Sequence, residues 1–210
     1  MEKRNKIKGI IFDLGGVLVE NFSVAFLEKA SKELKVRPDA LRRAVQREEP
    51  RLQRGEETIV QFWHKVYEKL KVRCPSDRAS FSLWVETYER HAKIKKDTIA
   101  LIRLLQSKYK LAILSNTLEE HNKINRKRKL FDYFDVVLLS NEVGMRKPEK
   151  EFFALASKKL DIPLSNLLFV DDEIRWISAA RKHGLQAILF KSADQLKEAF
   201  RKLGISVGKK

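Results

Sequence analysis

Short runs of apolar residues recur along the chain and predict five β-strands, at residues 7–12, 111–114, 136–139, 167–170 and 185–190. Between the later runs, apolar positions recur at helical spacing and predict helices at residues 98–105, 149–160, 174–183 and 193–203. Strands that alternate with helices form a parallel sheet covered on both faces. The pattern therefore predicts an α/β fold with a three-layer, Rossmann-like parallel sheet core.

The stretch after the first predicted strand breaks this alternation. Residues 21–91 show helical spacing throughout, and Pro38, Gly55 and Pro75 divide them into about four helices. We therefore predict a core made of residues 1–20 and 92–210, and a small α-helical cap, residues 21–91, inserted after the first strand. Because open α/β sheets bind ligands beyond the carboxyl ends of their strands, such an insertion would lie over the ligand.

Polar residues follow the predicted strands where the ligand would bind. They are Asp13 with Gly15 and Gly16, Ser115 with Asn116, Lys147 before Pro148, and Asp171 with Asp172. A carboxylate can attack phosphorus, a lysine ammonium can hold the phosphoryl oxygens, and carboxylate oxygens suit Mg²⁺. The set indicates chemistry on a phosphate group, although each residue alone is also typical of a helix cap, a turn or the surface.

In these residues the chain resembles the haloacid dehalogenase-like hydrolase superfamily. The four motifs of that superfamily match IIFDLGGVL, LAILSNT, GMRKPEKEFF and LLFVDDE, in the same order and over nearly the whole chain. Four ordered motifs are far more specific than any one of them. The resemblance extends to the branch that contains glucose-1-phosphate phosphatase and the N-terminal phosphatase domain of epoxide hydrolases.

The resemblance implies roles for the residues that bind and transfer phosphate. Asp13 would be the nucleophile that becomes an aspartyl phosphate, and Lys147 would be catalytic and would hold the phosphoryl oxygens. Ser115, Asn116 and Gly15 would complete the phosphate-binding site, Ser115 with the backbone that follows it. The substrate implied is a small phosphorylated metabolite.

The resemblance also implies Mg²⁺ as the cofactor. Its ligands would be the carboxylates of Asp13, Asp171 and Asp172 and the backbone carbonyl of Gly15. Asp171 would act directly or through water.

Two positions depart from the superfamily pattern. Most phosphatases of the superfamily have a second aspartate two residues after the nucleophile, which protonates the leaving alcohol, and here that residue is Gly15. A general acid contributes roughly 10² to 10⁴ in rate, so we expect substrates with acidic leaving groups, such as anomeric sugar phosphates. Trp176 stands where this branch commonly has asparagine, which predicts an altered setting for Lys147.

Composition limits the other functions. The chain has 210 residues, 43% of them hydrophobic, one cysteine, and a formal net charge of +16 with a pI of about 9.9. Neither a signal peptide nor an apolar run of membrane-spanning length is present, so we expect a cytoplasmic protein with no membrane partner. The basic run at residues 123–129 lacks interleaved aromatic residues, which disfavours nucleic acid as a partner. A monomer and a homodimer are both compatible with the sequence.

Two other functions stay open at this stage. The first is a cofactor-free haloacid dehalogenase, because those enzymes also lack the second aspartate, although the paired acids Asp171 and Asp172 favour a metal and phosphate. The second is a catalytically weak binding protein of the same fold, suggested by Gly15, Trp176 and the positive charge.

Overall fold

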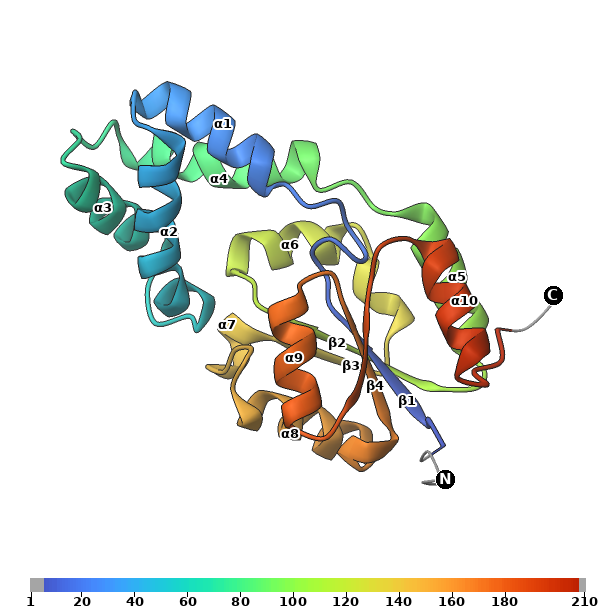
Figure 1. Cartoon of the computed structure of the whole chain (residues 1–210). Coiled ribbons are helices and arrows are strands. Elements are labelled where there is room, and N and C mark those ends of the chain that lie inside the picture. Colours follow the sequence, from blue (N-terminus) through green and yellow to red (C-terminus); the bar gives the residue numbers. More distant parts are fainter. Residues whose placement is uncertain (1–5, 208–210) are drawn as a thin grey trace.

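A five-stranded parallel sheet lies at the centre of the computed structural model, which describes residues 6–207 (Figure 1). The strands are β1 (Gly9–Phe12), β2 (Lys110–Ser115), β3 (Val136–Leu139), β4 (Leu167–Asp171) and β5 (Gln186–Leu189). They lie in the order β3-β2-β1-β4-β5, and every neighbouring pair is parallel. The five predicted strands are thus confirmed, with ends that differ by two residues or fewer.

Helices cover both faces of this sheet. One face carries α5 (Lys96–Leu105), α6 (Glu119–Lys127) and α10 (Ala193–Lys202), and the other carries α8 (Lys150–Leu160) and α9 (Ile174–Lys182). Side chains alternate along a strand, so Ile10 and Phe12 of β1 enter the first core while Ile11 enters the second. The predicted three-layer α/β fold is confirmed.

Four helices follow β1 and precede α5. They are α1 (Ser23–Leu34), α2 (Pro38–Gln53), α3 (Ile59–Leu70) and α4 (Asp77–His91), called here the four-helix segment. The predicted breaks hold, because α2 begins at Pro38 and ends just before Gly55, and the Ser76 hydroxyl caps α4 by accepting from the Ala79 N–H. Trp63 and Trp84 are buried in the core of the segment.

The register of the strands brings the predicted site residues to one edge of the sheet. Phe12 is paired with Ile113 on one side and Val170 on the other, so Asp13 emerges in the middle of the edge. Shorter elements complete the chain: η1 (Leu130–Tyr133), α7 (Ser140–Val143) and η2 (Leu164–Asn166). Within residues 6–207, no helix has the length and apolar character needed to cross a membrane.

Candidate active site

An ammonium group between two carboxylates forms the centre of the site. Lys147 Nζ donates to Asp13 Oδ1 at 2.8 Å and to Asp171 Oδ2 at 2.6 Å. The Lys147 side chain is 1% exposed, so the three charges interact in a medium that screens them weakly. Burial alone would lower the pKa of Lys147, but the two carboxylates raise it above its ordinary value, and the side chain stays protonated.

A third carboxylate completes the cluster. Oxygen atoms of Asp13, Asp171 and Asp172 all lie within 4.8 Å of one another. Gly16, at φ +69°, makes this approach possible, because a Cβ on it would lie 1.9 Å from Asp172 Oδ2. The glycine therefore serves two purposes, since it adopts a left-handed conformation and leaves room for the carboxylate.

Two carboxylates of this cluster, Asp13 and Asp172, have raised pKa values. Burial raises the pKa of Asp13 to about 7; Lys147 opposes this shift and Asp171 adds to it. Burial, Asp171 and Glu173 raise the pKa of Asp172 to about 6. Three carboxylates against one ammonium leave an excess of negative charge, which a divalent cation with oxygen ligands would relieve. The donor set therefore fits Mg²⁺.

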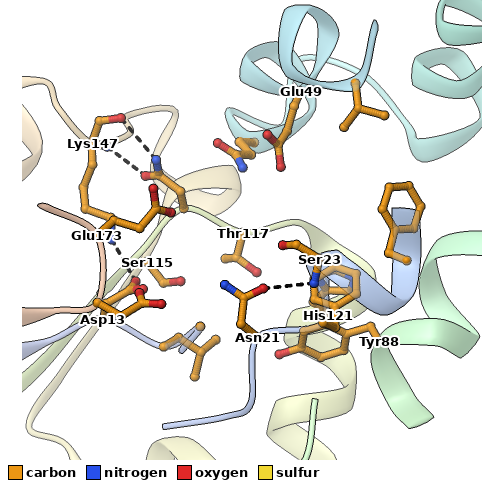
Figure 2. A pocket seen from close by; sticks show the side chains of 18 of the residues that line it. Asp13, Asn21, Ser23, Glu49, Tyr88, Ser115, Thr117, His121, Lys147 and Glu173 are labelled. Atoms are coloured by element: carbon orange, nitrogen blue, oxygen red, sulfur yellow. Dashed lines mark hydrogen bonds and ion pairs between the residues drawn. The ribbon is translucent and has the colours of Figure 1, made fainter. Parts of the chain in front are cut away.

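The segment that carries Lys147 is held by Asn116. The Asn116 amide accepts from the Lys147 backbone N–H at 2.8 Å and donates to the Lys147 carbonyl at 3.1 Å. Oδ1 and one N–H of the Asn116 side chain are thus engaged by the Lys147 backbone. Ser115 ends β2 beside Asp13 and is 3% exposed (Figure 2).

A cavity of about 520 Å³ opens from these residues toward the four-helix segment. Figure 2 shows Asp13, Ser115 and Lys147 on one side of it, and Tyr88, His121 and Ser23 on the other. The volume is typical of a pocket for a small molecule. Gly15 also lines it, and the space next to its Cα is open, because a Cβ there would have no neighbour within 4 Å.

Aromatic rings form the wall of the cavity opposite Asp13. His121 stacks on Tyr88 with the ring centroids 3.7 Å apart, and Phe22 meets both rings edge-on. Burial lowers the pKa of His121 to about 3, so its ring is neutral near neutral pH. Across from this wall, α2 contributes Glu49, whose pKa burial raises.

Trp176 lies against the cluster of Lys147 and its two carboxylates. Its indole is 8% exposed, and Lys147 Nζ lies 5.8 Å from the ring centroid. Arg175 stacks on the same ring at 4.3 Å, as cations do on aromatic faces. The indole is thus an aromatic neighbour of Lys147, and an altered setting for Lys147 stays a prediction.

The C-terminal end of α2 docks on the segment that carries Lys147. Arg146 donates from Nε and Nη2 to Gln53 Oε1, at 3.0 and 2.8 Å, and Arg54 Nη2 pairs with Glu149 Oε1 at 2.5 Å. These contacts join residues 93 and 95 positions apart in the chain. Sequence patterns missed Gln53 and Arg54, because polar residues at a helix end carry no mark of a distant partner.

The fold and the carboxylate cluster define an α/β protein with an acidic centre at the edge of its parallel sheet. A family model for haloacid dehalogenase-like hydrolases matches residues 7–184. The chain belongs to this family, and it is therefore a member of a family of enzymes.

A solved structure shares the fold over almost the whole chain. A HAD family enzyme from Bacteroides thetaiotaomicron superimposes with a TM-score of 0.76 and 24% identity, covering 94% of this chain and 100% of that one. The same enzyme has been solved in complex with magnesium and inorganic phosphate.

Curated relatives include named phosphatases. A ribulose-1,5-bisphosphate 5-phosphatase of Halopiger xanaduensis is 36% identical over 67 residues, which is 31% of this chain and 28% of that protein. A glyceraldehyde 3-phosphate phosphatase of Pyrococcus abyssi is 31% identical over 94 residues, 43% of this chain and 39% of that protein. The chain matches well under half the length of these relatives.

Proposed function

We propose that this chain is a Mg²⁺-dependent phosphatase of small phosphorylated metabolites that works through an aspartyl phosphate on Asp13. The observation that carries the proposal is the cluster of Asp13, Lys147 and Asp171, with Asp172 beside it and a cavity of about 520 Å³ in front. The paired acids support this function over metal-free dehalogenation, because they add negative charge that only a cation would balance.

The residues divide the chemistry among them. An oxygen of the Asp13 carboxylate attacks phosphorus, the bond from phosphorus to the leaving oxygen breaks, and water later hydrolyses the acyl phosphate to release inorganic phosphate. Lys147 holds Asp13 in place and offers its ammonium to the phosphoryl oxygens, with Ser115 and the Asn116 backbone N–H as further donors.

Asp13, Asp171, Asp172 and the Gly15 carbonyl would hold the Mg²⁺ ion. When bound, the ion stabilises negative charge that develops on the transferring phosphoryl group. The raised pKa values of Asp13 and Asp172 support this assignment, because both carboxylates favour a neighbouring positive charge.

Substrates with acidic leaving groups suit this site best. Gly15 offers no proton donor where the superfamily commonly has one. The rate should therefore suffer least for substrates whose leaving oxygen is stable as an anion. Anomeric sugar phosphates meet this condition, in keeping with the resemblance to the glucose-1-phosphate phosphatase branch. We infer that the four-helix segment is the cap that selects them, because α1, α2 and α4 line the cavity.

Phosphate release from sugar, acyl and nucleotide phosphates tests the proposal. We expect turnover at neutral pH that requires Mg²⁺ and that Asp13→Asn abolishes, because an amide cannot attack phosphorus. Asp161→Asn, a change at a carboxylate outside the site, is the control and should leave the rate unchanged. Mg²⁺-dependent turnover that survives Asp13→Asn would contradict the mechanism.

The contact between α2 and the Lys147 segment yields a second prediction. Arg54→Ala removes a partly buried, charge-assisted hydrogen bond to Glu149, worth about 1.5–3 kcal/mol. We expect kcat/KM to fall, because the end of α2 would hold the segment that carries Lys147 less firmly. Initial rates across substrate concentrations measure the effect.

A charge exchange separates this role from a general loss of stability. Arg54→Glu combined with Glu149→Arg should restore most of the lost kcat/KM, whereas each single reversal should not. Arg51→Ala is the matched control, because within residues 6–207 Arg51 pairs only with Glu56 and Glu57, which are close to it in the chain. Equal rates for Arg54→Ala and Arg51→Ala would show that the contact does not support catalysis.

A further inference from the structure

Three side chains of types that can bind a metal ion lie close together in the four-helix segment, away from the cavity. His64 lies on α3, Cys74 lies in the connection that follows, and Asp77 is the first residue of α4. Their donor atoms all lie within 4.8 Å of one another, and His64 Nε2 is 2.9 Å from Asp77 Oδ1. None of the three lines the cavity beside Asp13.

The donor types differ from those of the carboxylate cluster. A thiolate, an imidazole and a carboxylate suit Zn²⁺ and similar divalent transition metals, whereas Mg²⁺ requires oxygen ligands in octahedral geometry. Zinc bonds of about 2.0–2.3 Å in a tetrahedron, with a single sulfur ligand, place two donors about 3.3–3.6 Å apart. The present spacing, from 2.9 Å up to at most 4.8 Å, is therefore within reach of small side-chain rotations.

Charge also matches a divalent cation. With Cys74 as thiolate and Asp77 ionised, the two ligands carry the negative charge that one M²⁺ ion neutralises, and neutral His64 supplies the third bond. Cys74 is the only cysteine of the chain, so no intramolecular disulfide can consume it. His64 and Asp77 are exposed, which gives a metal ion direct access from solvent.

We propose that His64, Cys74 and Asp77 form a Zn²⁺ site with water as the fourth ligand, which ties α3 to α4. On binding, the Cys74 thiol loses its proton to solvent as the sulfur–zinc bond forms, so one proton is released for each ion bound. The site is independent of the proposed phosphatase chemistry, and it would stabilise α4, which lines part of the cavity.

Cobalt(II) absorption on the full chain tests the site, because only Cys74 can produce a sulfur-to-cobalt charge-transfer band. We expect one equivalent of Co²⁺ to produce the band and one equivalent of Zn²⁺ to abolish it. Cys74→Ser should remove the band even if Co²⁺ also occupies the carboxylate cluster. His64→Gln and Asp77→Asn should each weaken binding at least about tenfold. Even residues that only hydrogen-bond to metal ligands have effects of about this size when they are replaced, and these two residues would bind the metal directly.

The controls make the test decisive. His91→Gln changes another exposed histidine of the same segment and should leave the affinity unaltered. Circular dichroism verifies that each variant is folded. A wild-type chain without the band, or a band equally strong in His64→Gln and Asp77→Asn, would overturn the proposal, the latter by showing that an isolated thiol binds the metal.

Discussion

Replacing Lys147 by methionine is expected to abolish turnover and to destabilise the fold at neutral pH. Methionine has a similar volume but no charge, so Asp13 and Asp171 would remain buried without their shared ammonium. Removing one partner of a buried ion pair costs about 3–5 kcal/mol, because a charge is left uncompensated. Loss of a donor to the phosphoryl group lowers kcat by at least about 10²–10³-fold.

The destabilisation of the Lys147→Met variant should depend on pH with a definite sign. Without the ammonium, burial and repulsion by the Asp171 carboxylate raise the folded-state pKa of Asp13 further above its value in the unfolded chain. As the pH falls from about 8, the folded variant therefore binds protons before the unfolded variant does. Its free energy of unfolding, which is lower than that of wild type at pH 8, approaches the wild-type value toward pH 4. Urea unfolding at several pH values measures this.

Lys150→Met is the matched control for this variant, since Lys150 is an exposed lysine three residues further along the chain. It should change the free energy of unfolding by less than about 0.5 kcal/mol. A Lys147→Met protein that is as stable as the control at pH 8 would contradict the stabilising role of the ion-pair cluster. Wild-type turnover of that protein would contradict its catalytic role.

Introducing an aspartate at Gly15 is expected to increase turnover of substrates with poor leaving groups. The backbone leaves room for the side chain, because a Cβ on Gly15 would meet no atom within 4 Å. A carboxylic acid there could protonate the leaving oxygen, an effect of roughly 10² to 10⁴ in rate. We expect the largest gain for phosphates of primary alcohols and a small gain for anomeric and acyl phosphates.

Gly15→Asn separates proton donation from shape in this experiment. Asparagine has nearly the size of aspartate but cannot supply a proton, so it should not accelerate any substrate. The wild-type chain should turn over anomeric and acyl phosphates faster than phosphates of primary alcohols. Gly15→Asp should reduce the ratio between these rates. Equal rates for the two variants, or a wild type that prefers primary-alcohol phosphates, would contradict the role assigned to leaving-group acidity.

The alternation of apolar runs and helical patterns was sufficient to predict the sheet. Local periodicity determines which residues form strands, and the handedness of parallel crossovers leaves few ways to order them. The carboxyl ends of β1, β2 and β4 therefore had to meet, which placed Asp13, Ser115 and Asp171 together. The four motifs added Lys147 to this group, although they did not reveal its two ion pairs.

Side-chain contacts between distant segments could not be predicted from the sequence. Asn116, predicted at the phosphate, uses its amide to hold the Lys147 backbone, and its role as a phosphate ligand stays a prediction. The sequence shows that Trp176 replaces the asparagine common in this branch. Its position against Lys147 depends on how α9 packs on the sheet. Such contacts depend on rotamers and distances that no residue spacing specifies.

The sequence by itself determined the α/β class, the helical insertion after β1, the family and the group of polar residues at the edge of the sheet, because these depend on local patterns and chain order. The tertiary structure alone decided that Lys147 bridges Asp13 and Asp171, and that Gln53 and Arg54 hold the segment around it. Those contacts join residues up to 134 positions apart, and only the folded chain brings such residues within hydrogen-bonding distance.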